Sequence, residues 1–382
     1  MKRYIYVLLM VGCLFSGCVE ESNEERKTTP ASLTDEDEDN TKAMIDDEYI
    51  YKLPIIFHVL YRDQNDRTQY VPVARLQELV DYVNEIYRGN VYGKSEDIHV
   101  KFFLAQYDER GKRLKTPGVE YIKYGDEYPI VASRFMSDVS GKNMQYIWEP
   151  NEYINVMMYH FADEDNGLVL GVSHMPMIFK KDSTIAGLES VDLDYISKRN
   201  LRYPRCVSIN SRYINQESTR YKQIDKGRSG YQYTNTDVIV TFAHELGHYL
   251  GLHHTFAEEK GENGYRLADH CSDTDYCEDT PSYNRTEYND YLERYVRNTP
   301  EKDINIWDVI ARNNCQNERF NSDNIMDYSV SFSFRLSKEQ KHRIREVLYH
   351  SPLMPGPKKK SVGSRATTIR NEKLDLPMTI VQ

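Results

Sequence analysis

The residues best suited to catalysis or metal binding lie in one short stretch, 241–254. His244 and His248 are four residues apart, so a helix would place both imidazoles on one face. Two imidazoles at this spacing can bind one Zn²⁺ at about 2.0–2.1 Å. Gly251 permits a backbone conformation that ends the helix and turns the chain, so that His254 can approach the same ion. Three protein ligands leave a fourth position for water, which is typical of a catalytic zinc site.

Glu245 directly follows the first of these histidines, so we expect its carboxylate beside the metal. There it can accept a proton from a water whose pKa the zinc has lowered, which predicts hydrolysis of a carbonyl compound. A lone histidine is more often an ordinary core or surface residue. Five fixed positions in register, however, arise by chance in a chain of this size on the order of once in 10⁴ to 10⁵ sequences. His253 breaks the spacing, and we interpret it as a neighbour of the site and not a ligand.

A single helix must carry this pattern. Its apolar residues recur at i, i+4, i+7 and i+11 and form a buried stripe opposite the histidines: Ile239, Ala243, Leu246 and Leu250. Thr236 precedes the stripe, and its hydroxyl can cap the first turn. We therefore expect a helix over about 236–251.

The remaining body alternates between strand and helix patterns. Apolar runs and period-two alternation predict four strands, over 53–61, 98–104, 153–159 and 168–175. The helical spacing of apolar residues from Leu76 to Tyr87 predicts one helix, and Gly89 ends it. Another begins at Ser337, where Gln340 completes a capping box. No internal repeat is visible, so one α/β-type domain over 50–352 is the simplest account.

Both ends of the chain are expected to be extensions of this domain. Residues 1–17 combine two basic residues with a short apolar run, which is typical of a signal peptide. Cys18 then stands where a bacterial lipobox cysteine would be acylated, although an ordinary cleaved signal is the alternative. Residues 18–49 predict a solvated acidic tether, and 353–382 a loose C-terminal extension. We expect an exported lipoprotein anchored in the cell envelope, with the outer membrane as its location and surface exposure as an open option.

The composition excludes several classes of protein. The 382 residues are 40% hydrophobic and 28% charged, with a formal net charge of −10. These values exclude a polytopic membrane protein, a collagen-like repeat and a wholly disordered chain. No basic patch is present, so nucleic acid is not an expected partner. The sequence does not specify an oligomeric state, and we assume a monomer.

The pattern HExxHxxGxxH resembles the metzincin clan of zinc proteases, and the fuller string HELGHYLGLHHTF looks like its pappalysin family. The segment 277–281 matches the Asp-Thr-Pro element of that family, and 324–328 looks like the Met-turn of the clan. The resemblance covers roughly residues 50–350. It implies an α/β (α+β) fold with a twisted mixed sheet, a backing helix and an active-site helix. A smaller C-terminal subdomain would hold the Met-turn and a C-terminal helix.

The resemblance also assigns roles to single residues. It implies that Met326 forms an apolar floor beneath one catalytic zinc ion, and that the Tyr328 hydroxyl stabilises the oxyanion. The strand over 168–175 would be the edge strand on which substrate lies as an added strand. Some family members follow the Met-turn with a pair of acids, whereas this chain continues with the neutral residues 329–332. We therefore expect no demand for arginine after the scissile bond.

Four cysteines remain in the expected mature body: Cys206, Cys271, Cys277 and Cys315. Disulfides persist in exported proteins, and four cysteines allow three connectivities. The resemblance implies a Cys271–Cys315 bond, which leaves the other two to pair or stay free. A second zinc site from His270, Cys271 and Cys277 is a less favoured alternative.

The acidic loop after the zinc motif is a candidate calcium site. Asp273, Asp275 and Asp279 supply oxygen ligands there, and related proteins bind calcium in this region. A merely solvated acidic loop is the alternative, so structural Ca²⁺ remains an open prediction.

These observations together favour a zinc-dependent endopeptidase that acts on protein or peptide substrates. A catalytically idle surface protein that uses the same fold for binding is the first alternative. A zinc hydrolase of a non-peptide substrate is the second, because the motif specifies the nucleophile and not the substrate. The presence of Glu245 favours an enzyme over the idle protein.

Overall fold

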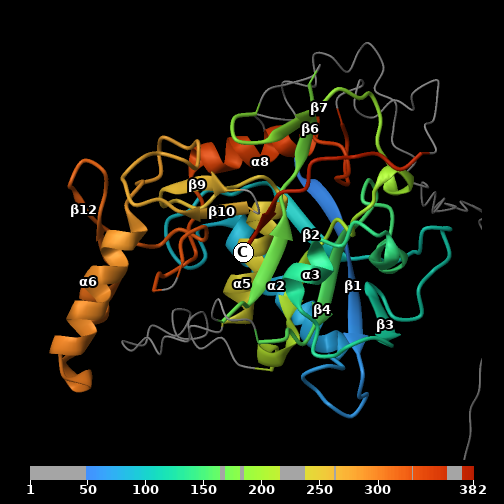
Figure 1. Ribbon diagram of the computed structural model, residues 1–382, viewed down its shortest axis with the longest axis horizontal. Helices are drawn as coiled ribbons and strands as arrows, with labels where there is room; N and C mark the ends of the chain where they lie inside the picture. Colours follow the sequence, from blue (N-terminus) through green and yellow to red (C-terminus); the bar gives the residue numbers. More distant parts are fainter. Residues whose placement is uncertain are drawn as a thin grey trace, which may run out of the picture.

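A seven-stranded mixed sheet is the centre of the molecule (Figure 1). The computed structural model describes residues 49–163, 168–180, 185–215, 237–261, 264–328, 330–358 and 372–382. The order of hydrogen-bonded strands is β13-β5-β8-β4-β1-β2, and β3 also pairs with β1. The strands are β1 (Tyr51–Tyr61), β2 (Val100–Leu104), β3 (Val119–Lys123), β4 (Ile154–Tyr159), β5 (Gly171–His174), β8 (Val207–Asn210) and β13 (Ile380–Val381).

The interior of the sheet is parallel and its β5 side is antiparallel. Strand β1 pairs in parallel with β2, β3 and β4, and β4 pairs in parallel with β8. Strand β5 runs antiparallel to β8, and β13 runs antiparallel to β5. The long apolar run of β1 is almost wholly buried, as expected of a central strand covered on both faces.

Two helices pack on each other against the sheet: α2 (Val73–Arg88) and α5 (Val238–Tyr249). Helix α2 ends at Gly89, whose φ of 68° a residue with a side chain adopts rarely. The Tyr87 hydroxyl of α2 donates to the Ala243 carbonyl of α5 at 3.0 Å, which ties the two helices together. The N-terminal cap of helix α5 lies one position later than expected. This cap is the carboxylate of Asp237, which accepts from the amides of Ile239 and Val240, whereas Thr236 lies outside the described residues.

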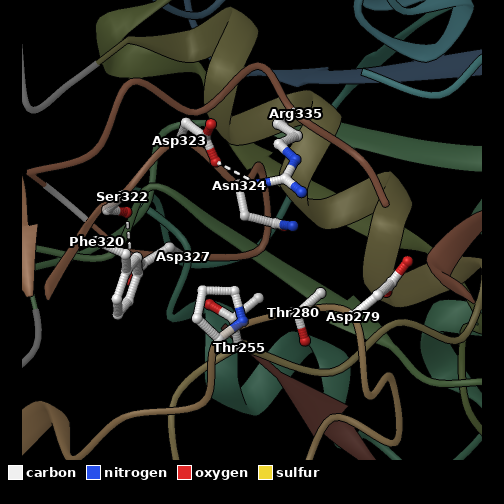
Figure 2. A pocket seen from close by; sticks show the side chains of 10 residues that line it. Thr255, Asp279, Thr280, Phe320, Ser322, Asp323, Asn324, Asp327 and Arg335 are labelled. Atoms are coloured by element: carbon white, nitrogen blue, oxygen red, sulfur yellow. Dashed lines mark hydrogen bonds and ion pairs between the residues drawn. The ribbon is translucent and has the colours of Figure 1, made fainter. Parts of the chain in front are cut away.

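A smaller part of the molecule follows α5 and has its own apolar cluster of Phe256, Tyr283 and Tyr288. It includes α8 (Lys338–His350), which begins at the predicted capping box of Ser337 and Gln340. Figure 2 shows a small cavity in this part, where Asp323 and Arg335 form an ion pair at 3.5 Å. The mixed α/β fold class is thereby confirmed.

Several short elements complete the described chain. The helices are α3 (Ala132–Met136), η2 (Lys142–Tyr146), η3 (Lys198–Asn200), η4 (Ser211–Tyr213), α6 (Arg285–Asn298), η5 (Glu301–Asp303) and α7 (Ile306–Ile310). The strands are β6 (Met177–Phe179), β7 (Glu189–Val191), β9 (Glu258–Gly261), β10 (Gly264–Leu267), β11 (Ala311–Asn313) and β12 (Arg319–Asn321). Each of the pairs β6–β7, β9–β10 and β11–β12 forms a separate two-stranded sheet.

The structure corrects two expectations, one about the C-terminal segment and one about the strand with which it pairs. The segment 353–382 is not a loose extension where it is described, because Leu353 and Met354 are fully buried and β13 joins the main sheet. Strand β5 is consequently not an edge strand, since it lies between β8 and β13. The signal peptide, Cys18 and the tether up to residue 48 lie outside the described residues. Among the described helices, none is long and apolar enough to cross a membrane.

Candidate metal centre

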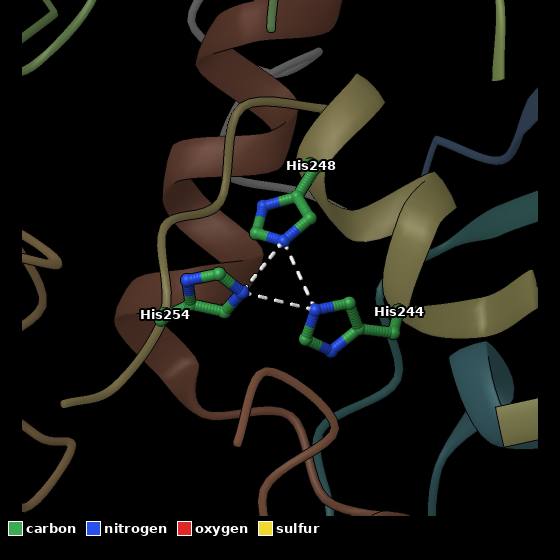
Figure 3. Close-up of side chains that lie close together, drawn as sticks. All are labelled: His244, His248 and His254. Carbon is green, nitrogen blue, oxygen red and sulfur yellow. Dashed lines mark hydrogen bonds between the residues drawn. The ribbon is translucent and has the colours of Figure 1, made fainter. Parts of the chain in front are cut away.

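The three predicted ligands meet at one point (Figure 3). His244 and His248 project from α5, and His254 returns to them after the turn. The Nε2 atom of His248 lies 3.0 Å from Nε2 of His244 and 3.0 Å from Nε2 of His254. The Nε2 atoms of His244 and His254 are 3.2 Å apart. Tetrahedral zinc ligands at 2.0–2.1 Å would lie about 3.3 Å apart. The cluster therefore has nearly the dimensions that one zinc ion requires.

The outer nitrogens of two rings fix which nitrogen faces the centre. Nδ1 of His244 lies 2.7 Å from the Ile325 carbonyl, and Nδ1 of His248 lies 2.8 Å from the Leu252 carbonyl. A carbonyl oxygen can only accept, so both Nδ1 atoms carry the proton. Burial lowers the pKa of both rings and keeps them neutral. Each Nε2 consequently offers a lone pair to the centre, as a metal ligand must.

The acidic side chain of Glu258 lies close to the outer nitrogen of the third histidine. Its carboxylate lies 2.9 Å from Nδ1 of His254, and burial raises the pKa of this carboxyl to about 8. A carboxylate behind a ligating histidine orients the ring and raises its basicity. The zinc-binding pattern does not include Glu258, although its position four residues after His254 is a signal for such a contact.

Glycines allow the close packing around the turn and the floor. Gly251 ends the helix at a φ of 94°, and a Cβ there would lie 2.6 Å from Val347. Met326 is fully buried beneath α5, where a Cβ on Gly247 would lie only 2.4 Å from its sulfur. Gly251 thus lies at the turn after α5, and Met326 packs against that helix.

Glu245 lies beside the histidine cluster with a carboxylate that is poorly solvated. The residue is 2% exposed, and its Oε2 has no hydrogen-bond partner. Burial raises the pKa of this carboxyl well above its usual value. Strand β5 passes very close to it, since a Cβ on Gly171 would lie 2.7 Å from Oε1. The sequence did not identify Gly171 as part of this site.

Tyr328 lies against the third histidine. Its ring centroid is 4.5 Å from that of His254, with the rings 70° apart. Burial raises the pKa of the hydroxyl, so it remains a hydrogen-bond donor. The hydroxyl donates to the main-chain oxygen of Gln382, at the end of the segment that contains β13. The ring of Tyr328 therefore borders the histidine cluster.

A buried ionic cluster holds the backbone before Tyr328. Asp327 forms an ion pair with Nε of Arg312 at 3.0 Å and accepts a hydrogen bond from the Tyr283 hydroxyl at 2.6 Å. The guanidinium of Arg285 lies 3.4 Å from the same carboxylate and 4.9 Å from the centroid of the Tyr328 ring. These contacts fix the Met-turn relative to the histidines.

Comparison with known proteins agrees with this arrangement. Residues 226–349 match the family model Peptidase_M43, described as Pregnancy-associated plasma protein-A. The resemblance to the pappalysin family is thereby confirmed for the segment that holds the histidines, Glu245 and the Met-turn. The comparison with curated proteins found no match.

Two solved structures are similar to this chain at low identity. Mature mirolysin of Tannerella forsythia in complex with a cleaved peptide is 19% identical, with a TM-score of 0.46, and the match covers 78% of this chain and 92% of that chain. Mirolysin in complex with compound 9 is also 19% identical, with a TM-score of 0.47 and the same two shares, 78% and 92%.

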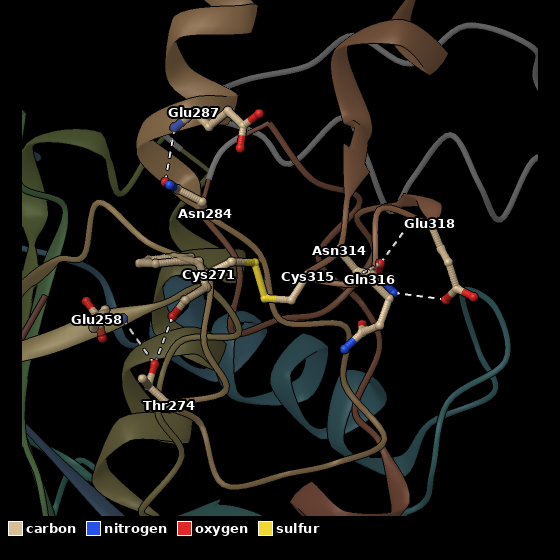
Figure 4. The surroundings of a disulfide bond; sticks show 10 residues. Glu258, Cys271, Thr274, Asn284, Glu287, Asn314, Cys315, Gln316 and Glu318 are labelled. Carbon is tan, nitrogen blue, oxygen red and sulfur yellow. Dashed lines mark hydrogen bonds between the residues drawn. A yellow bond between two sulfur atoms is a disulfide. The ribbon is translucent and has the colours of Figure 1, made fainter.

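One of the open cysteine predictions is resolved within this peptidase segment. Cys271 and Cys315 form a disulfide, as the resemblance implied (Figure 4). Cys206 and Cys277 are both buried and free, so they do not pair with each other. Because Cys271 is bonded, the alternative zinc site with His270 and Cys277 is not available.

The predicted calcium ligands have other partners. The Asp275 carboxylate accepts from the amide of Cys277 and the hydroxyl of Thr280, and Asp279 accepts from the hydroxyl of Ser337. Asp273 accepts from nearby backbone amides. Within the described part of the chain, the three zinc-site histidines are the one group of His, Cys, Asp and Glu side chains close enough to share an ion. The calcium prediction therefore gains no support there.

His253 is separate from this group, as expected. Its ring is buried and packs edge-on against Tyr265 and Tyr276, with centroids 5.2 and 5.3 Å away.

Proposed function

We propose that the chain is a zinc-dependent endopeptidase. The observation that carries the proposal is the convergence of three Nε2 lone pairs beside the unpartnered carboxylate of Glu245. The match of residues 226–349 to a peptidase family supports a metallopeptidase. The zinc ion would be held by His244, His248 and His254.

The bound zinc would polarise the substrate carbonyl and lower the pKa of water, while the side chains of this chain handle the protons. A nearby dication also stabilises the carboxylate form of Glu245, which burial alone disfavours. Glu245 accepts a proton from water as the water oxygen attacks the carbonyl carbon of the peptide. It then passes that proton to the departing nitrogen as the C–N bond breaks. The Tyr328 hydroxyl donates to the carbonyl oxygen as negative charge develops on it.

The decisive experiment compares the parent chain with Glu245→Gln on a library of proteome-derived peptides, with zinc content measured on both. Loss of a positioned general base lowers the rate by about 10²- to 10⁴-fold. We expect equal zinc content and cleavage by the parent alone. Equal cleavage by both chains would refute the assigned base, and absence of cleavage by the parent would favour an idle binding protein. The same library reports specificity, and we expect no dominant basic residue after the scissile bond.

We also propose, on sequence grounds alone, that the enzyme is exported and anchored through lipidation of Cys18. Metabolic labelling with a fatty acid, lost in Cys18→Ala, would support this location. Labelling that persists in the variant would contradict it.

A further inference from the structure

The segment 372–382 lies along the strand on which we expected substrate to bind. Strand β13 pairs antiparallel with β5, with Ile380 opposite His174 and Val381 opposite Ser173. Just before this pair, the amide of Met175 donates to the carbonyl of Thr379 at 2.9 Å. Figure 1 shows the red end of the chain, marked C, in the middle of the molecule. The segment thus occupies the side of β5 that an added strand would need.

The rest of the segment is held in an extended form along the protein. The Leu374 amide donates to the Asn200 carbonyl at 2.9 Å, and the Tyr203 hydroxyl donates to the Pro377 carbonyl at 2.7 Å. Alternate side chains of the segment pack against a buried apolar cluster: Leu376, Met378 and Ile380. These contacts show a fitted occupant and not a chain end that lies on the surface.

The β9–β10 hairpin approaches the segment from its other side. A Cβ on Gly264 would lie 2.9 Å from the main-chain oxygen of Ile380, so the hairpin can approach this closely only without a side chain there. Val381, the next residue, is only 6% exposed. The segment is therefore enclosed between β5 and β10 immediately before its last residue, which contacts Tyr328.

The end of the segment makes a contact that the proposed mechanism assigns to the substrate. The Tyr328 hydroxyl donates to the main-chain oxygen of Gln382. In the proposed mechanism this hydroxyl donates to the oxygen of the scissile carbonyl. The Gln382 main-chain oxygen consequently takes the contact that the mechanism gives to the oxygen of the scissile carbonyl, and Val381 takes the place of the substrate residue before it.

We propose that the segment 372–382 is an intramolecular occupant of the substrate-binding cleft, and that peptides bind only after it leaves. This inference rests on the proposed endopeptidase function. The segment takes the place of the substrate residues N-terminal to the scissile bond. A tethered segment of this kind has an effective concentration of about millimolar, which outcompetes micromolar substrate of similar affinity. The apparent affinity for peptides is reduced by the fraction of molecules that are open.

The same placement indicates which peptides the cleft accepts. The segment binds as an extended strand through main-chain hydrogen bonds, which do not depend on side-chain identity. Val381 and Ile380 are the side chains next to the catalytic end, and both are aliphatic. Substrates with aliphatic residues at the second and third positions before the scissile bond fit this cleft.

The test uses a fluorescent synthetic peptide with the sequence of residues 372–382 as its probe. The host is the full, zinc-loaded chain carrying Glu245→Gln, so that the probe is not cleaved. Val381→Asp places a charge at the enclosed position and should release the end of the segment. Asp375→Ser, on an exposed residue of the same segment, is the matched control. Fluorescence anisotropy then gives the dissociation constant for each chain.

We expect the chain with Val381→Asp to bind the probe at least about tenfold more tightly than the parent, and Asp375→Ser to bind like the parent. Equal binding by all three chains, or binding by none, would overturn the proposal. The corresponding chains with Glu245 intact should show a lower KM in Val381→Asp with kcat unchanged. If no chain cleaves any peptide but the probe still distinguishes them, the occupied cleft stands and the proposed function fails.

A covalently closed form provides the opposite measurement. Ser173 and Val381 are register partners, so Ser173→Cys with Val381→Cys is positioned for a disulfide across the pair. The oxidised double variant should exclude the probe, and mild reduction should restore binding. Each single variant and the parent, treated with the same reductant, control for the Cys271–Cys315 bond. Probe binding that is unaffected by the closed bond would also refute the proposal.

Discussion

A polar group lies close to the outer nitrogen of each histidine in the cluster. The sequence pattern predicted the three rings, but two of their partners are main-chain carbonyls, those of Ile325 and Leu252. Carbonyls leave no trace in a motif, because every residue has one. Glu258 differs from these carbonyls, because it lies close to the third ring through its side chain and can therefore be tested by substitution.

Replacing Glu258 with Gln should weaken zinc binding. A zinc ion on the other side of the ring would favour the ionised form of the Glu258 carboxyl, 2.9 Å from Nδ1 of His254, and this charge would strengthen the ring as a ligand, whereas an amide is neutral. Loss of such a partner costs about 10- to 100-fold in metal affinity. Competition with a fluorescent chelator would measure the change.

The neighbouring Glu259 provides a matched control. Its carboxylate is partly exposed and pairs with Arg266 at 2.9 Å and His270 at 3.5 Å, away from the histidine cluster. Glu259→Gln should leave zinc affinity unchanged. If both glutamine variants bind zinc like the parent, Glu258 has no positioning role.

At the scale of elements, the approach of β5 to α5 shapes the catalytic carboxylate. Gly171 on β5 leaves room for Glu245 on α5, because a Cβ would lie 2.5 Å from its Cγ. Gly171→Ala must therefore displace the carboxylate. A misplacement of about 1 Å can cost on the order of 100-fold in rate. We expect kcat to fall by about that factor while zinc content is retained.

Gly125→Ala is the control for this change, because nothing lies within 4 Å of a Cβ at that position. It should leave kcat unaltered. Full activity in Gly171→Ala would mean that the carboxylate tolerates the displacement, and the assigned geometry would be wrong.

Elements with a strong local pattern were predictable, and those defined by distant partners were not. The apolar stripes of α2 and α5 and the continuous run of β1 indicate their own structure. The alternation of Leu374, Leu376, Met378 and Ile380 was also a strand signal, but the preceding stretch of Pro355, Gly356, Pro357 and three lysines favoured a loose extension. Its partner β5 is four residues long, and only the tertiary structure brings the two together.

At the scale of the whole molecule, the metal centre joins the sheet-packed helix α5 to the smaller part that follows it. His244 and His248 belong to α5, whereas His254 lies beyond the turn and the Met-turn supplies the carbonyl of Ile325. The amide of Thr255 also donates to the Met326 carbonyl at 3.3 Å. The family resemblance predicted this division, but the closing of the cleft by the end of the chain depends on contacts that no motif encodes.

Zinc should therefore stabilise the folded chain as a whole. A ligand that binds only the folded state at 1,000 times its dissociation constant adds about 4 kcal/mol to the free energy of unfolding. We expect chelation to lower Tm and added zinc to restore it. In His254→Asn, which lacks one of the three ligands, Tm should respond far less to zinc.

The adjacent His253 separates loss of a ligand from loss of a buried ring. Its ring is as deeply buried as that of His254, yet it packs against Tyr265 and Tyr276 instead of facing the cluster. His253→Asn should lower Tm through lost packing but keep the full upward shift on zinc addition. A zinc-dependent shift that disappears equally in both variants would mean that the shift reports general destabilisation. A shift that persists unchanged in His254→Asn would show that the stabilising ion binds elsewhere, because burial alone cannot supply the missing ligand.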